Sequence, residues 1–178
     1  QTENYDPEII PVLVDQIIDV MDQLDLASAH VEGQSLGGWV AMQLALQHPE
    51  RVDRLILTTT MGYRPDAAAI DGFVEPNWAA NVPSSIEVLE QPSFENVRTR
   101  MSRILAQPER LTDEAIQVRQ ALYQQPELAK VQKCFITEYL SGSTIQKHII
   151  TDKLAKQISQ PTLVYWGDAN RTPPALGQ

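Results

Sequence analysis

The chain has 178 residues, of which 43% are hydrophobic, and this is enough for one domain with a sizeable core. The formal net charge of −9, with only acidic charges in the first 35 residues, disfavours binding to nucleic acid and to anionic membranes. A single cysteine, Cys134, excludes an internal disulfide bond, and without an apolar run that could cross a bilayer we expect a cytoplasmic protein.

The first third of the chain alternates helices and strands. Apolar residues recur at helical spacing from Ile10 to Leu24, which predicts an amphipathic helix that begins at residues 6–7. A short strand is expected at 29–32 and a second helix at 39–48. The β-branched run 52–60 predicts a buried parallel strand. This order, with short links, is typical of a doubly wound α/β architecture.

The middle of the chain contains helix signals only. Ser93 and Thr112 stand where N-cap residues are expected, and the predicted helices span 86–90, 94–105, 113–124 and 126–140. Strand character returns at 161–166. A helical block between two sheet strands predicts an inserted lid, so we divide the chain into a core segment 1–63, a helical lid 64–150 and a return to the core 151–178.

One short motif carries most of the functional information. Residues Gly33, Gln34, Ser35, Leu36 and Gly37 form a G-x-S-x-G pattern between a predicted strand and a predicted helix. This context predicts a nucleophile elbow, a strained turn that holds the serine at a helix N-terminus, where negative charge is favoured. A side chain at either glycine is expected to collide across the turn. The alternative is a Gly/Ser turn that only joins strand to helix.

Together, the elbow, its helix, the next strand, the helical insert and the returning strand that ends in Trp166-Gly167 resemble the α/β-hydrolase fold. Within that fold the chain resembles the meta-cleavage product hydrolases, which cleave carbon–carbon bonds in 2-hydroxy-6-oxo-dienoates formed by ring fission of catechols. The more specific similarity is in the insert. The stretches 110–114, 118–119 and 125–127 resemble the lid helix of that family, whose arginine reaches the acidic end of the substrate.

The resemblance implies a role for several positions. Ser35 matches the nucleophile, and Leu36 matches the residue whose backbone N–H supplies half of the oxyanion hole. Gln34 matches the polar residue beside the nucleophile. Arg119 matches the lid arginine, whose guanidinium grips a carboxylate with paired hydrogen bonds. The alternative for this arginine is a surface ion pair or hydrogen bond with a neighbour: Asp113, Glu114 or Gln120.

The position of the catalytic acid departs from the family pattern. The turn after the returning strand holds Asn170 where the family has its acid, and an amide can orient an imidazole but cannot stabilise an imidazolium as a carboxylate does. Asp168 is a stand-in acid or an ordinary turn residue, and Asp66 is a further candidate. Glu32, on the strand before the elbow, is either paired and structural or part of the site.

The catalytic histidine is a second departure, because in this fold it follows the acid. No histidine follows Asn170. His30 and His48 are expected to be structural, and His148 precedes the acid turn and is therefore out of order. We expect the chain to be an internal fragment of a longer hydrolase, inactive alone because a serine hydroxyl without a base is a weak nucleophile.

The sequence therefore predicts a serine-dependent hydrolase that acts on a small-molecule anionic substrate, by carbon–carbon cleavage. The chemistry calls for no metal and no organic cofactor. A homo-oligomer stays open. The alternatives are a carboxylesterase on the same scaffold and a non-catalytic family member that binds a ligand or a partner. Haloalkane dehalogenation is disfavoured, because it needs a carboxylate at the position of Ser35.

Overall fold

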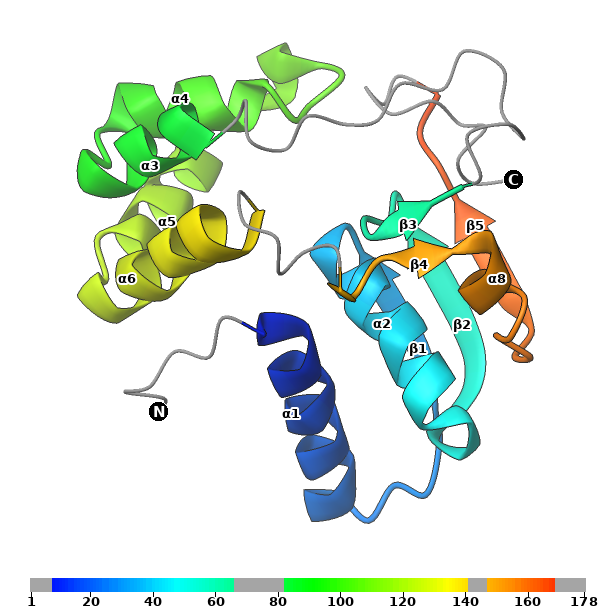
Figure 1. Ribbon diagram of the computed structural model, residues 1–178. Helices are drawn as coiled ribbons and strands as arrows, with labels where there is room; N and C mark the ends of the chain where they lie inside the picture. The colour runs from blue at the N-terminus through cyan, green and yellow to red at the C-terminus, as the bar shows by residue number, and fades with distance from the viewer. Residues whose placement is uncertain (1–7, 66–81, 141–146, 169–178) are drawn as a thin grey trace. The chain divides into compact units, whose positions relative to one another are not determined.

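The computed structural model describes residues 8–65, 82–140 and 147–168 (Figure 1). The chain divides into two compact units. One unit contains residues 8–76 and 146–178 and is called the sheet unit below. The other contains residues 1–7 and 77–145 and is called the helical unit. Two of the predicted acid positions, Asp66 and Asn170, lie outside the described residues.

The sheet unit is built on a parallel sheet of strands β1 (Ala29–Gln34), β2 (Val52–Thr58) and β5 (Thr162–Tyr165), in the order β1-β2-β5. Residues Val31 and Leu55 are partners in the first pairing, and Leu57 and Val164 in the second. The three predicted strands are therefore confirmed. β1 runs two residues further than expected, to Gln34, and β2 ends two residues earlier, at Thr58.

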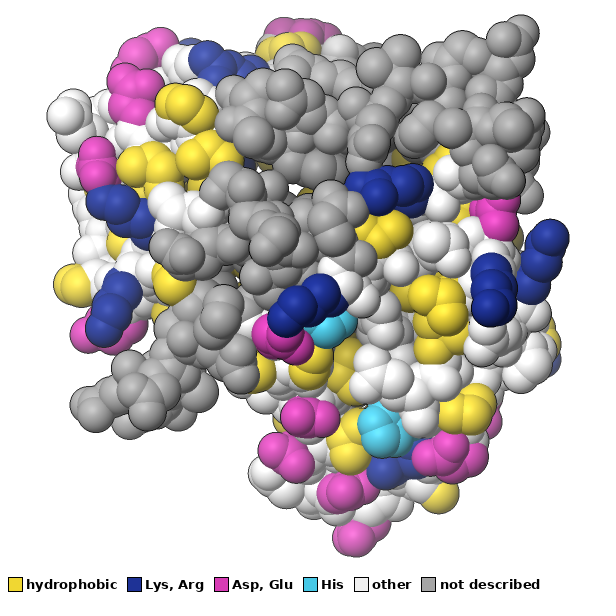
Figure 2. Space-filling view, in the orientation of Figure 1, with side chains coloured by type: hydrophobic (Ala, Val, Ile, Leu, Met, Phe, Trp, Pro, Cys, Tyr) yellow, Lys and Arg dark blue, Asp and Glu magenta, His cyan; other side chains and the backbone are white. Residues whose placement is uncertain are grey.

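Two helices of the sheet unit precede and follow β1: α1 (Ile9–Gln23) and α2 (Leu36–Gln47), the latter followed by a 3-10 turn, η1 (Pro49–Arg51). α1 begins after Glu8, later than the expected start at residues 6–7. It is amphipathic as predicted, and Figure 2 shows acidic side chains gathered over its outer side. α2 is apolar on nearly all sides because it packs against α1, β1 and β2 together.

The core of the sheet unit lies between these layers. Its largest fully buried side chains come from both helices, from β2 and from the segment after the helical unit: Ile10, Val14, Trp39, Leu44, Leu55 and Ile150. Burial of several large apolar side chains on a common surface is the dominant favourable contribution to folding. α2 is consequently fixed against the sheet at the point where the predicted elbow lies.

A second, two-stranded parallel pairing joins β3 (Tyr63–Arg64) to β4 (Ile150–Thr151), and a short helix, α8 (Asp152–Ala155), follows β4. The backbone N–H of Ile150 donates to the carbonyl of Gly62 at 2.7 Å. The phenol of Tyr63 donates to the carboxylate of Asp152. This pairing is not predictable from the sequence, because β3 and β4 have two residues each and so show no periodicity.

The described part of the helical unit contains only helices, as predicted, and the chain order is α3 (Val82–Glu90), α4 (Phe94–Ser102), η3 (Pro108–Arg110), α5 (Asp113–Tyr123), α6 (Pro126–Cys134) and the π-helix η4 (Phe135–Leu140). The predicted N-caps are confirmed: Ser93 accepts from the N–H of Asn96 at 3.1 Å and Thr112 from that of Ala115 at 3.2 Å. Helix α3 begins four residues earlier than expected.

The helical unit has a hydrophobic core of its own. The buried members are Val88, Leu89, Val97, Ile116, Tyr123 and Ile136. These side chains come from four different helical segments, α3, α4, α5 and η4, so packing rather than local propensity holds the unit together. The borders of the three predicted segments stay predictions. None of the described helices is both long and apolar enough to cross a bilayer.

The contact between Tyr63 and Asp152 predicts an unusual tyrosine titration. Burial and the adjacent Asp152 carboxylate raise the pKa of Tyr63 from 10.0 to about 12, because both disfavour the phenolate. The protonated Tyr63 therefore contributes to the stability of the folded state in full below pH 10, and this contribution is lost as the pH rises through about 12. We expect one tyrosine to ionise near pH 12 in an ultraviolet absorbance titration, and Tyr63→Phe to remove that component.

The matched control is Tyr165→Phe, because Tyr165 is 66% exposed and lies on β5. This variant should keep the high-pH component. If Tyr63→Phe still showed the component near pH 12, its assignment to Tyr63 would be contradicted.

Candidate active site

Ser35 occupies a strained turn between β1 and α2. Its φ of 51° and ψ of −118° fall outside the regions that non-glycine residues commonly adopt, and such a conformation costs about 1–3 kcal/mol. Backbone hydrogen bonds hold it: the N–H of Ser35 donates to the carbonyl of Thr58 at 3.1 Å, and its own carbonyl accepts from Met61 at 3.0 Å. The side chain is exposed. The predicted strand–turn–helix geometry is therefore present, with Ser35 exposed.

Two glycines are sterically required at this turn, and one of them is not the one expected. A Cβ on Gly33 would lie 2.3 Å from the carbonyl oxygen of Gly37. A Cβ on Gly38 would lie 2.3 Å from Oγ1 of Thr60, on the segment that follows β2. A Cβ on Gly37 would meet nothing within 4 Å. The expectation for Gly33 is confirmed, and the expectation that a side chain at Gly37 would collide is wrong, since the close approach falls on the next glycine.

Leu36 is the first residue of α2, directly after the Ser35 N-cap. Backbone N–H groups in the first turn of a helix have no acceptor within the helix, and the helix dipole adds partial positive charge there. An N–H adjacent to an accessible hydroxyl is suited to binding an oxyanion. This placement is what the predicted oxyanion role of Leu36 requires, and the role itself stays a prediction.

The carboxyl ends of the three strands meet at the Ser35 edge of the sheet. The N–H of Thr59, directly after β2, donates to the carbonyl of Tyr165 at the end of β5 at 2.9 Å. Thr59 also has a positive φ, 44°, which is rare for a β-branched residue. Ligand sites of open α/β sheets lie at this edge. The run of three threonines gave no turn signal, so Thr59 was not predicted as part of the site.

Asp168 is exposed and follows β5 at the same edge of the sheet. Ser35 follows β1, with β2 between the two strands, and strand spacing alone separates β1 from β5 by about 10 Å. A stand-in acid at that separation would need an imidazole between it and the serine. The role of Asp168 as the acid therefore stays a prediction. Asn170 lies outside the described residues.

The three histidines each lie within 4.0 Å of a carboxylate oxygen: His30 of Asp53 at 3.8 Å, His48 of Glu50 at 4.0 Å, and His148 of Glu8 at 3.5 Å. His30 is five residues before Ser35, which corresponds to about 16 Å along an extended strand. His48 follows α2 at the end opposite Ser35. Among the described residues, the ion-pair partners of the three histidines are therefore carboxylates remote in sequence from Ser35.

Glu32 and Gln34 are exposed and alternate with buried Gly33 along β1. Glu32 lines a cavity of about 500 Å³ together with Leu36 and apolar residues of the two neighbouring helices, among them Leu13, Ile17 and Val40. No described ion pair involves Glu32. Its carboxylate is thus next to the elbow, while Gln34 is directly before Ser35 at the end of the strand.

Arg119 lies on α5, in the helical unit. Its side chain is exposed, and the guanidinium lies 5.8 Å from the centroid of the Tyr123 ring. Two of the three surface partners considered for it are engaged elsewhere: Asp113 accepts from Arg98 at 2.8 Å, and the Gln120 amide donates to the carbonyl of Pro92. The Arg119 guanidinium therefore rests on an aromatic face rather than in a described ion pair. Its role in substrate binding stays a prediction.

Comparison with known proteins decides the family. A sequence profile described as alpha/beta hydrolase fold matches residues 6–175. The chain belongs to this family. The match runs through both units and confirms the predicted fold class, an α/β-hydrolase with a parallel sheet and a helical insertion.

Individual relatives of this α/β-hydrolase are named as hydrolases of 2-hydroxy-6-oxo compounds. The chain is 28% identical over 162 residues to a 2-hydroxy-6-oxononadienedioate/2-hydroxy-6-oxononatrienedioate hydrolase of Cupriavidus pinatubonensis, covering 87% of this chain and 50% of that protein. It is 28% identical over 156 residues to a 2-hydroxy-6-oxo-6-phenylhexa-2,4-dienoate hydrolase of Comamonas testosteroni, covering 87% and 51%. The chain thus spans about half the length of the curated relatives it matches.

A solved structure agrees with this likeness. A meta-cleavage product hydrolase from Pseudomonas fluorescens IP01 superposes with a TM-score of 0.75 at 28% identity, over 99% of this chain and 60% of that one. The resemblance inferred from the motifs to the meta-cleavage product hydrolases is therefore confirmed at the level of similarity.

The geometry of the elbow predicts opposite effects at two glycines of the same motif. Gly33→Ala forces a methyl group against the backbone at Gly37 and should destabilise the protein by about 1–3 kcal/mol or more. Gly37→Ala, in the open first turn of α2, should stabilise it by up to about 1 kcal/mol. Urea unfolding of both variants of the full-length protein measures the difference. Equal destabilisation by both alanines would show that the turn is not built as described.

Proposed function

We propose that this α/β-hydrolase cleaves a carbon–carbon bond in a 2-hydroxy-6-oxo-dienoate, with Ser35 as the nucleophile. The observation that carries the proposal is the exposed Ser35 side chain on a strained turn at the N-terminus of α2. Strain at a non-glycine residue persists only where the surrounding structure imposes it, and such positions cluster at active sites. The relatives named as dienoate hydrolases support the choice of substrate class.

In the proposed mechanism the dienol substrate first becomes a ketone by proton transfer. Ser35 then participates in attack on the ketone carbon, and the bond from this carbon to the dienoate carbon breaks. With water, the acyl fragment leaves as a carboxylic acid, and the other fragment gains a proton and leaves as a 2-hydroxydienoate. The serine needs a general base to lose its proton. The chemistry requires no redox step, because water supplies both the hydroxyl and the proton that the products gain.

The N–H of Leu36 supports the charged stage of this reaction. As the carbonyl carbon becomes tetrahedral its oxygen becomes negative, and a preorganised N–H donor at a helix N-terminus stabilises that charge. Removing one such donor in other enzymes costs about 100–1,000-fold in turnover. Gln34, next to Ser35 at the end of β1, is proposed as a polar substrate contact on the other side of the serine.

The acid that orients the base is proposed to be Asp168, with Asn170 at the usual family position as the alternative. A carboxylate stabilises the imidazolium that forms during catalysis, whereas an amide holds the ring only by a hydrogen bond. Asp168 lies at the carboxyl edge of β5, the edge that also carries Ser35.

Two other functions rest on the same site. A carboxylesterase would use Ser35 and Leu36 in the same way, and the elbow does not discriminate between an ester and a carbon–carbon bond. Rapid turnover of a p-nitrophenyl ester with no loss of the yellow dienoate absorbance would favour the esterase. A ligand-binding member without catalysis is favoured by the amide of Asn170 at the acid position.

Substitution of the serine tests the proposal directly. In the full-length protein, a phosphonate serine probe should label Ser35, and Ser35→Ala should abolish labelling and lower dienoate turnover by about 10,000-fold or more. Ser28→Ala, which changes a serine just before β1, is the control and should keep both activities. Absence of label at Ser35 in the wild-type protein would favour the ligand-binding alternative.

Substitution of Arg119 tests the acidic end of the substrate. Arg119→Gln removes a charge-assisted donor and should raise KM for the dienoate by about 10–100-fold, while KM for a neutral ester stays unchanged. Arg119→Lys should restore only part of the affinity, since an ammonium lacks the paired geometry. The control is Arg103→Gln, which removes another exposed arginine of the helical unit. An equal rise in KM for dienoate and ester would remove Arg119 from the substrate carboxylate.

A further inference from the structure

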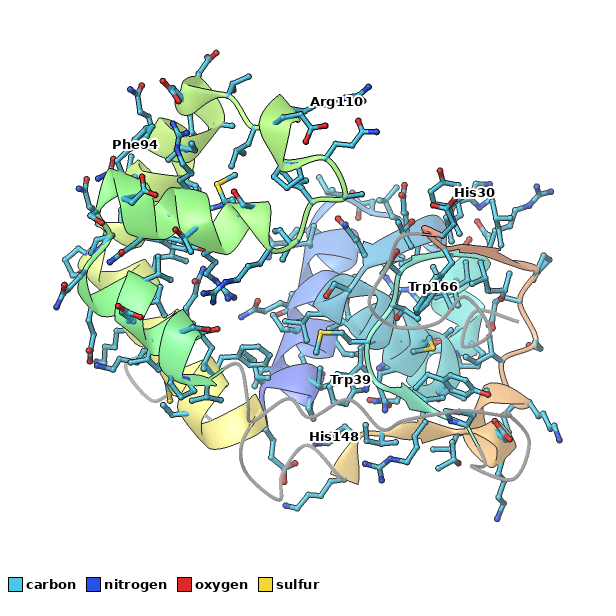
Figure 3. The ribbon with its side chains drawn as sticks, turned by 90° about the horizontal axis from the view of Figure 1, so that it is seen from above. His30, Trp39, Phe94, Arg110, His148 and Trp166 are labelled. Carbon is cyan, nitrogen blue, oxygen red and sulfur yellow. The ribbon has the colours of Figure 1, made fainter. Side chains whose placement is uncertain are left out.

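Trp39 lies in the first turns of α2, four residues after Ser35, and is fully buried. Its ring packs on Gly62, where a Cβ would lie 2.0 Å from Cγ of the indole and where φ is 82°. Its indole N–H donates to the backbone carbonyl of His148 at 2.7 Å (Figure 3). One side chain of the elbow helix thus contacts two segments that are far apart in the sequence.

Gln43 repeats the second contact one helical turn later. Its amide N–H donates to the same His148 carbonyl at 2.7 Å, and its amide oxygen accepts from Gln47 at 3.0 Å. The side chain is only 8% exposed, so an unmet hydrogen bond there would carry a desolvation penalty. A buried glutamine in an otherwise apolar helix face is unusual, and its donor and acceptor are both satisfied.

The two contacted segments flank the helical unit in the sequence. Gly62 precedes that unit, which begins at residue 77, and His148 follows it, because the sheet unit resumes at residue 146. The two ends are joined to each other by the Ile150-to-Gly62 hydrogen bond and by the pairing of β3 with β4. The entering segment is also bound to the elbow, because the N–H of Met61 donates to the Ser35 carbonyl.

We propose that Trp39 and Gln43 are positioning residues that anchor the two segments flanking the helical unit, at Gly62 and at residue 148, to the helix carrying Ser35. The inference rests on the proposed function, since it concerns turnover of the dienoate at Ser35. The anchor acts through the backbone at residue 148 and through the face of Gly62, and both contacts lie within the sheet unit. Its role is to keep Gly62 and the backbone at residue 148 at a fixed position relative to Ser35.

The test removes the two donors. Trp39→Phe keeps a ring on Gly62 but loses the N–H and part of the buried indole volume, and Gln43→Leu removes the amide. Each single variant leaves one donor on the His148 carbonyl, so protection of the Ile150 amide should change little. The double variant leaves that carbonyl without either donor, so its effect should exceed the sum of the single effects. Met42→Leu, a volume-conserving change at another buried position of α2, is the control.

Two measurements on the full-length protein separate anchoring from general stability. In hydrogen exchange, the double variant should exchange the Ile150 amide at least tenfold faster, while amides of β1 and β2 keep wild-type protection. In kinetics, KM for the dienoate should rise at least fivefold, while the rate of phosphonate labelling at Ser35 changes less than twofold. The probe is small and does not require the insertion to hold it.

The outcomes distinguish the two hypotheses. If the wild-type protein neither reacts with the phosphonate nor cleaves the dienoate, the proposed function fails, and the exchange of Ile150 still reports on the anchor. If the wild-type protein is active and the double variant matches Met42→Leu in both exchange and KM, the positioning role is overturned. The positioning role would also be overturned if the double variant showed slower labelling of Ser35 and lower protection of all strands together with the rise in KM. That pattern would describe a merely structural role.

Discussion

The positive φ of Ser35 is the constraint on which the sheet unit depends. A serine in this conformation is less stable by about 1–3 kcal/mol than one in an ordinary region, so other contacts have to impose it. The structure supplies them from three directions. The Ser35 N–H is held by β2, its carbonyl accepts from Gly38 and Met61, and α2 is fixed to the sheet by buried apolar side chains. The same contacts leave the side chain exposed at the edge where three strands end.

The close approach at this turn also explains how the insertion is attached. Gly38 packs against Thr60, and Gly62 packs against Trp39, so the segment after β2 runs directly across the start of α2. A larger side chain at either glycine would push that segment away from the elbow. The turn that presents the serine and the segment after β2, which leads toward the helical unit, therefore form one packed structure within the sheet unit.

Much of the fold follows from the sequence because its signals are local. The helices with N-cap residues, such as those after Ser93 and Thr112, begin where predicted, since a cap is satisfied within three residues of the chain. The elbow was predictable for the same reason. Two other helix starts were predicted less accurately: α1 begins at Ile9 rather than at residues 6–7, and α3 begins at Val82, four residues before its expected start.

The parts that were missed depend on distant partners. The β3–β4 pairing joins segments nearly ninety residues apart, and neither strand is long enough to have a period. The error at Gly37 arose because the identity of the crowding neighbour, Thr60, is a property of the packed structure. The contact of Trp39 with residue 148 has no sequence signature, because a backbone carbonyl is present at every position.

That last property has an evolutionary consequence. Trp39 and Gln43 both bind a main-chain oxygen, so this contact places no demand on the side chain at 148, whose imidazole lies instead 3.5 Å from Glu8. Position 62 has no such freedom, because the indole fills the space that any Cβ would need. Selection on these contacts should therefore act unequally on the two segments. It should keep glycine at position 62, before the helical unit, and tolerate different residues at position 148, after it.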